Sequence, residues 1–261
     1  MKISYYIMLL GVIFVLCACA PTGFQDSSKD SAEELHVAAA SDLYDAFTEM
    51  GEKFKGATGI EVTFSFGSTG QMTQQIEQGA SSYDVFAAAH ESYIDRLIKN
   101  DVMNKETKKR YATGRIGLMY DRDTYEALTP EDLLEDKVQR IAIANPDHAP
   151  YGKAAKQALE TWGIWEEVEE KLVFGENIQQ TLQYVESENV DVGFIALSLS
   201  KQSSLAFKPI KAEDHEPILQ ALGIPDRSNQ KAEAKQFIDY IYSDEGQAVM
   251  NEYGFSLPEE E

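Results

Sequence analysis

The chain has 261 residues, with 44 Asp and Glu against 23 Lys and Arg, and its formal net charge is −21. This acidity argues against nucleic-acid binding, which depends on clusters of Lys and Arg. It also argues against an anion site built on a general positive potential. Any bound anion must therefore be held by local dipoles and hydrogen-bond donors.

The N-terminus predicts a secreted lipoprotein. Lys2 precedes an apolar run over residues 5–16, which is too short for a membrane span of about 20 residues. The run ends in Leu-Cys-Ala-Cys at residues 16–19, which resembles a bacterial lipobox. We therefore expect residues 1–18 to be a lipoprotein signal peptide and Cys19 to carry a lipid. A plain signal peptide with incidental cysteines is the alternative.

The segment after the lipid differs from the rest of the chain. Residues 19–34 are small, polar and charged, and predict a flexible tether. Both cysteines, Cys17 and Cys19, precede this point, so an acylated Cys19 would leave the domain without a disulfide, thiolate catalysis or a cysteine metal site. The remaining part, about 230 residues, suffices for one large or two small domains.

From Leu35 onwards, the hydrophobic pattern alternates between strand and helix. Strands are expected at 35–39, 62–66, 84–89, 114–120, 140–144, 173–174, 190–196 and 217–222. Helical faces are expected at 43–54, 72–79, 93–97, 154–162, 178–185, 234–241 and 247–253. Repeated strand–helix units predict an α/β fold with mostly parallel sheets and helices on both faces. The strands at 114–120 and 217–222 are the expected crossings between two lobes.

Four junctions between a strand and a helix have a composition suited to anion binding. They lie at Ser41, at Ser68-Thr69, at 145–152 and at 175–178. A helix start offers unpaired N–H groups and a partial positive charge, so it can hold an anion. Because ligands of α/β sheets bind at the carboxyl ends of strands, the junctions predict an oxyanion site in a cleft between two lobes.

These junctions also carry the motifs of a known family. The motifs are AAASDL at 38–43, FGSTGQ at 66–71, NPDHAPYG at 145–152, GENI at 175–178 and DVGFIALS at 191–198. Over residues 35–257 the chain resembles the molybdate-binding periplasmic receptors of ABC importers (the ModA type), which are type II solute-binding proteins. The resemblance implies a two-lobed fold, with each lobe a mostly parallel sheet flanked by helices. Lobe 1 would comprise 35–115 plus 219–261, and lobe 2 would comprise 116–218.

The resemblance also implies the oxyanion ligands. They would be the hydroxyl of Ser41, the hydroxyl of Ser68 or Thr69, and the backbone N–H groups of Tyr151 and Ile178. Molybdenum would be bound as molybdate through these same residues. Some members of the family add a tyrosine hydroxyl at the position of Ala196, which this chain lacks. Either the Tyr151 hydroxyl replaces it, or the site uses fewer donors.

The function implied by the resemblance is capture of molybdate, or of tungstate, for an ABC permease and its ATPase. The protein would be a monomer, anchored by its lipid on the extracytoplasmic face of the cell membrane. It would need no cofactor, would bind no nucleic acid and would catalyse no reaction. A receptor for sulfate or phosphate, and a sensor or adhesion lipoprotein that reuses the fold, remain alternatives.

A secreted serine hydrolase is the alternative from a different class. Ser41 or Ser68 would be the nucleophile and His148 the base, which requires a ring nitrogen within about 3 Å of the hydroxyl. Residues 67–70 (GSTG) are not a Gly-x-Ser-x-Gly motif, and they lack the lysine of a phosphate-binding P-loop. We therefore expect His148 to be a structural loop histidine that hydrogen-bonds its own turn.

Overall fold

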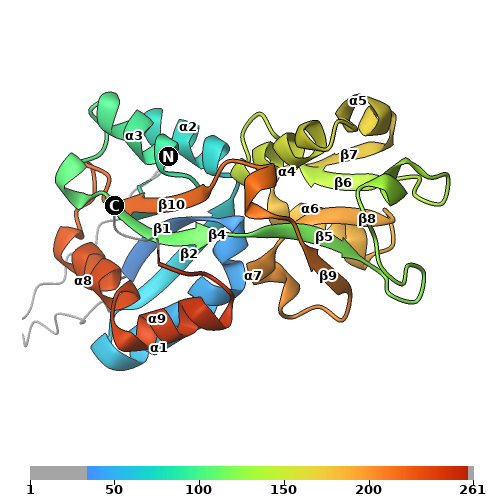
Figure 1. Cartoon of the computed structure of the whole chain (residues 1–261). Coiled ribbons are helices and arrows are strands. Elements are labelled where there is room, and N and C mark those ends of the chain that lie inside the picture. Colours follow the sequence, from blue (N-terminus) through green and yellow to red (C-terminus); the bar gives the residue numbers. More distant parts are fainter. Residues whose placement is uncertain (1–33, 81, 258–261) are drawn as a thin grey trace, which may run out of the picture. The chain divides into compact units, whose positions relative to one another are not determined.

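The computed structural model describes residues 34–80 and 82–257 (Figure 1). The expected signal peptide, the lipidated Cys19 and all of the expected tether except Glu34 lie outside these ranges. The described residues belong to one compact unit. Among them, no helix is both long enough and apolar enough to cross a membrane.

The first of two sheets has the strand order β2-β1-β3-β10-β4. Its strands are β1 (Glu34–Ala40), β2 (Glu61–Gly67), β3 (Val85–Ala88), β4 (Lys109–Gly114) and β10 (Ile218–Gly223). Its helices are α1 (Tyr44–Thr58), α2 (Thr69–Glu77), α3 (Glu91–Lys99), α8 (Lys231–Ile241) and α9 (Asp244–Glu252). Successive residues of β1 point to opposite faces, so Val37 packs with residues of α1, α8 and α9, whereas Ala38 packs with residues of α2 and α3 (Figure 1).

The second sheet has the strand order β7-β6-β8-β5-β9. Its strands are β5 (Ile116–Tyr120), β6 (Ile141–Ala144), β7 (Leu172–Gly175), β8 (Val192–Ala196) and β9 (Ala206–Pro209). Its helices are α4 (Pro150–Thr161), α5 (Trp165–Val168), α6 (Ile178–Glu186) and α7 (Leu197–Ser200). Short 3₁₀ segments are η1 (Ser41–Leu43), η2 (Lys105–Thr107), η3 (Glu131–Leu134), η4 (Glu169–Lys171) and η5 (Ala212–Asp214).

Both sheets are mixed, which corrects the expectation of mostly parallel sheets. In the first sheet β1 pairs in parallel with β2 and β3, whereas β10 is antiparallel to β3 and β4. In the second sheet β6 pairs in parallel with β7 and β8, whereas β5 is antiparallel to β8 and β9. Every antiparallel pair includes β5 or β10, the strands by which the chain enters the second sheet and returns to the first.

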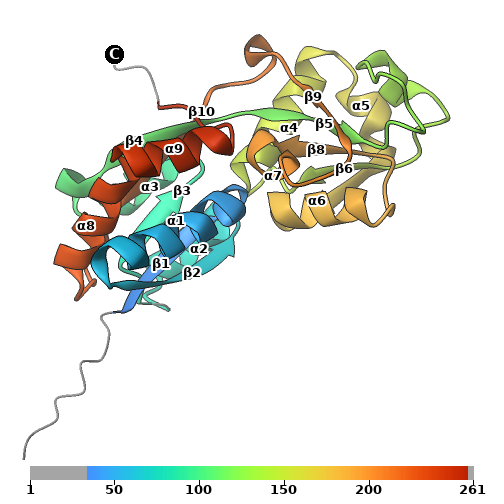
Figure 2. The same cartoon turned by 90° about the horizontal axis from the view of Figure 1, so that it is seen from below.

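The crossing from the first sheet to the second is a single residue between two strands, whereas the sequence predicted one continuous strand. The strand expected at 114–120 is two strands, β4 and β5, which are joined at Arg115 and pair in different sheets (Figure 2). On the return, Ile218 pairs with Gly114 and so belongs to the first sheet, although the sequence placed it in the second lobe.

Candidate functional site

The register of the parallel strands brings the four junctions together in two pairs. Ala40, the last residue of β1, lies opposite Gly67, the last residue of β2. In the second sheet, Ala144 at the end of β6 lies opposite Gly175 at the end of β7. The two segments that follow each pair of strands therefore begin side by side.

All four junctions line one pocket, whose cavity volume is about 10 Å³. The lining residues are Ala40, Ser41, Asp42, Gly67, Ser68, Thr69, Ala89, Ala149, Pro150, Tyr151, Asn177 and Ile178. That volume is about the room of one water molecule, so the pocket is far smaller than the roughly 300–1,000 Å³ sites that hold organic ligands. The five predicted oxyanion ligands are all present in this lining, which contains no Lys, Arg or His. Asp42 carries its only charged side chain.

Two helices direct open backbone donors at this pocket. The first N–H groups of a helix have no acceptor within the helix. In α6, the Asn177 side chain accepts from the N–H groups two and three residues later, both at 3.0 Å, and leaves the Ile178 N–H without an acceptor among the described residues. In α4, Pro150 fills the first position and has no N–H, so Tyr151 supplies the first open donor.

The hydroxyl groups at the first two junctions differ in what they already bind. The Ser41 hydroxyl has no hydrogen-bond partner in the described part of the chain. Thr69 Oγ1 accepts from the Ala89 N–H at 3.2 Å, so its own proton remains available for a ligand. Ser68 Oγ instead donates to the carbonyl oxygen of His148 at 2.7 Å. At the second junction, the free hydroxyl proton therefore belongs to Thr69.

The sequence suggested that His148 hydrogen-bonds its own turn, but its ring contacts Ser68 instead. Its Nδ1 lies 2.7 Å from Ser68 Oγ, within the distance that a hydrolase requires. The Ser68 proton, however, is directed at the His148 carbonyl, and both contacts are satisfied when Nδ1 is protonated and donates to Oγ. The other ring nitrogen lies 3.9 Å from the exposed carboxylate of Glu176. In that tautomer the ring donates to Ser68 and does not act as its base.

A buried polar network behind the pocket was missed by sequence reasoning. Asp42 is 1% exposed, and its Oδ2 accepts from the Tyr151 hydroxyl at 3.0 Å and from Gln220 Nε2 at 2.6 Å. Gln220 Oε1 in turn accepts from the Tyr111 hydroxyl at 2.7 Å. The Ser198 hydroxyl donates to the Asp42 carbonyl at 2.7 Å. Asp42 Oδ1 is buried and has no hydrogen-bond partner among the described residues.

The electrostatics of this network are unfavourable to a charged Asp42. Burial raises the pKa of its carboxyl from 3.8 to about 6, although hydrogen bonds from Gln220 and Tyr151 act in the opposite direction. Burial likewise raises the pKa of the Tyr151 hydroxyl well above its usual value of 10.0. The network therefore keeps a neutral tyrosine hydroxyl directed at a carboxyl group that titrates near pH 6.

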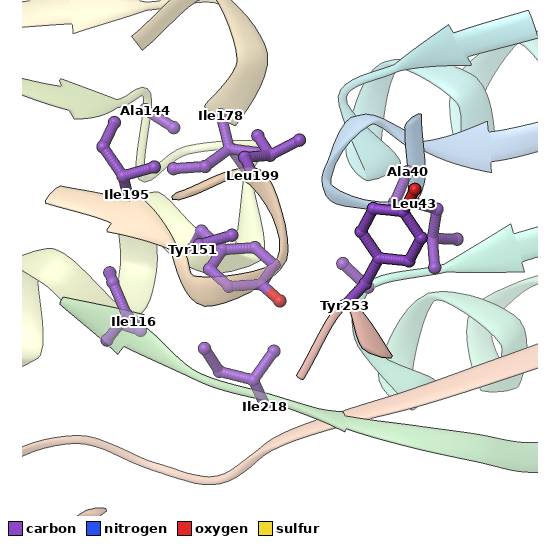
Figure 3. Close-up of a cluster of buried hydrophobic side chains, with 14 of the residues drawn as sticks. Ala40, Leu43, Ile116, Ala144, Tyr151, Ile178, Ile195, Leu199, Ile218 and Tyr253 are labelled. Atoms are coloured by element: carbon purple, nitrogen blue, oxygen red, sulfur yellow. The ribbon is translucent and has the colours of Figure 1, made fainter. Parts of the chain in front are cut away.

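The Tyr151 hydroxyl does not replace the donor missing at Ala196, because it is directed at Asp42. Figure 3 shows its ring reaching from α4 toward the segment of Ala40 and Leu43. Ala196 is buried at the end of β8 and does not line the pocket. Among the described residues, no three His, Cys, Asp or Glu side chains are grouped as metal ligands.

Comparison with known proteins relates this chain to a family of binding proteins. The sequence model of bacterial extracellular solute-binding proteins matches residues 35–256. YvgL of Bacillus subtilis, provisionally assigned as an ABC transporter substrate-binding lipoprotein, is 30% identical over 261 residues, with 98% of each chain covered. The molybdate-binding protein ModA of Azotobacter vinelandii is 30% identical over 260 residues, again with 98% of each chain covered.

A solved structure supports the same relationship. The periplasmic molybdate-binding protein of A. vinelandii superimposes with a TM-score of 0.80 at 27% identity, covering 86% of this chain and all of that one. The resemblance indicated by the motifs and the two-lobed type II fold are thereby confirmed.

Proposed function

Because the chain belongs to the family of bacterial extracellular solute-binding proteins, we propose that it captures molybdate and delivers it to an ABC importer. Members of this family bind a solute for transport, and the protein is not an enzyme. The finer assignment, molybdate as the solute, rests on the pocket and on the similarity to ModA.

The observation that carries the proposal is a small pocket with open neutral donors and no cation. Molybdate is a tetrahedral dianion with four acceptor oxygens. The Ser41 and Thr69 hydroxyls and the Tyr151 and Ile178 N–H groups can supply one donor for each oxygen. A charge-assisted hydrogen bond contributes roughly 1.5–3 kcal/mol. The helix N-termini of α4 and α6 contribute a further ~0.3–2 kcal/mol each.

The proposed ligand set takes Thr69 rather than Ser68, because the Ser68 proton is already donated to His148. Molybdenum would be held as molybdate, with no direct bond from the protein to the metal and no cofactor. Tungstate, an oxyanion of the same charge and shape, would bind in the same way.

The remaining parts of the proposal concern location and partners. The family acts outside the cytoplasm, and we infer that a lipid on Cys19 holds this member at the cell membrane, as the lipoprotein assignment of YvgL suggests for that relative. The proposed partners are an ABC permease and its ATPase. We infer that the receptor is a monomer.

One observation favours phosphate as the second candidate. Asp42 lines the pocket, and its buried Oδ1 has no partner in the part of the chain that the structure describes. Phosphate near neutral pH carries a proton, which such an oxygen would accept, whereas molybdate and sulfate have no proton to donate. A phosphate receptor would therefore depend on the Asp42 carboxylate, and a molybdate receptor would not.

Calorimetric titration of the full-length protein in mild detergent with molybdate, tungstate, sulfate and phosphate tests the proposal. We expect binding heat and a rise in melting temperature with molybdate and tungstate. Absence of both with molybdate would overturn the proposed function. Phosphate binding that is lost in Asp42→Asn would establish the second candidate instead.

A further inference from the structure

The first turn of α2 leaves its own capping interactions unmade. Ser68 is the N-cap residue, yet its side chain accepts no hydrogen bond from the helix. Its hydroxyl donates to the His148 carbonyl at 2.7 Å, and the N–H of Gly70 donates to the same oxygen at 2.9 Å. At an ordinary helix start, a serine and an N–H at these positions satisfy each other. Here both bind one carbonyl of the other lobe.

Packing at this contact requires glycine at position 70. A Cβ there would lie 2.8 Å from both Cβ and the carbonyl oxygen of His148, and 3.0 Å from its Cα. The backbone of Gly70 does not have positive φ, so its conformation alone would allow any residue. Glycine weakens a helix relative to alanine. Glycine is therefore needed at position 70 because the His148 backbone lies so close to it.

A third contact joins the same two segments. Gln71 Nε2 donates to Glu176 Oε2 at 2.5 Å. Gln71 follows β2 of the first sheet, whereas Glu176 follows β7 of the second. Ser68, which lines the pocket, lies beside these contacts, so the contacts bridge the two lobes at the edge of the candidate site.

We propose that the first turn of α2 is a latch that holds the two lobes closed over the bound oxyanion, with Ser68 and Gly70 as positioning residues and not ligands. The identity of the anion rests on the proposed function, whereas the latch is a property of the chain itself. Opening the cleft breaks both hydrogen bonds to the His148 carbonyl. Each neutral bond favours the closed state by about fivefold, so losing both shifts the equilibrium toward the open state by about thirtyfold.

The test is Gly70→Ala in the full-length protein, with release of radiolabelled molybdate into excess unlabelled molybdate as the readout. The added methyl group prevents the approach of His148 and removes none of the proposed ligands. We expect release about thirtyfold faster than in the wild type and an association rate within about twofold. The matched control is Gly56→Ala in α1, where a Cβ meets nothing within 4 Å, and its release rate should not change.

Release from Gly70→Ala at the wild-type rate would overturn the latch. Amide hydrogen exchange by NMR separates this failure from failure of the proposed function, because it needs no ligand. In the anion-free protein, the Gly70 N–H should exchange at least about tenfold more slowly than the Thr69 N–H, after correction for intrinsic rates, since of these two groups only the Gly70 N–H has an acceptor among the described residues. Equal exchange at these two positions would refute the latch even if no oxyanion binds.

Discussion

Replacing Asp42 by asparagine removes a buried carboxyl group whose charged form destabilises the folded chain. Burial raises the pKa of Asp42 from 3.8 to about 6. A group that binds its proton more tightly in the folded state than in the unfolded state lowers the free energy of unfolding as pH rises. The cost is therefore absent below about pH 4, grows between pH 4 and 6, and is constant above pH 6.

The magnitude follows from the size of the shift. A shift of about two pKa units, at 1.36 kcal/mol per unit, corresponds to roughly 3 kcal/mol above pH 6. Asparagine retains one side-chain oxygen for the bonds from Tyr151 and Gln220. Its amide would occupy the place of Oδ1, which has no partner within residues 34–80 and 82–257, and this offsets part of the gain. We expect Asp42→Asn to unfold with a free energy higher by about 1–3 kcal/mol at pH 7.5, and by much less at pH 4.

Urea unfolding followed by circular dichroism, at several pH values from 4 to 7.5, measures this difference. The control is Asp147→Asn, which removes an equal charge from an exposed loop position and should give no such pH-dependent gain. A difference between Asp42→Asn and wild type that stays constant from pH 4 to 7.5 would refute the reasoning.

Two further changes test the site and the network behind it. Thr69→Val and Ser41→Ala should each weaken molybdate binding by about ten- to a hundredfold in calorimetry, because each loses a hydrogen bond worth ~1.5–3 kcal/mol. The control Thr69→Ser keeps the hydroxyl and should bind molybdate within a few-fold of wild type. Wild-type affinity in both variants that lack the hydroxyl would contradict the ligand assignment. Gly114→Ala would place a Cβ 2.3 Å from the Tyr151 hydroxyl oxygen, so we expect a loss of about 1–3 kcal/mol in urea unfolding. Unchanged stability would mean that the Tyr151 hydroxyl can move away from the added methyl group with no loss of free energy, which would contradict this expectation.

The elements with a strong local pattern could be predicted from the sequence. The helical face at 43–54 and the alternating strand at 62–66 correspond to α1 and β2. The edge strand β9 was missed because it is four residues long and ends in Pro209, so it has too few positions to show a period. The break between β4 and β5 at Arg115 is set by partners in two different sheets, and local sequence does not contain this information.

The same distinction applies to the site. The junctions could be located because parallel strands bring their carboxyl ends to one edge. The Asp42–Gln220 bond joins residues 178 positions apart, and the bond from Ser68 to His148 joins residues 80 apart. An N-cap serine usually bonds its own helix, so nothing local indicates that Ser68 binds elsewhere. These long-range pairings determine which hydroxyl protons remain available for an anion.

The absence of Lys, Arg and His from the pocket lining has a consequence for the kinetics of capture. A chain with a net charge of −21 repels an approaching dianion, and no cation at the pocket counteracts that repulsion locally. Added salt shortens the range of the repulsion, to about 8 Å at physiological ionic strength. Association should therefore speed up as salt is added, whereas hydrogen bonds from neutral donors change little once the anion is bound. A receptor that attracts its anion with lysine or arginine would show the opposite dependence on salt.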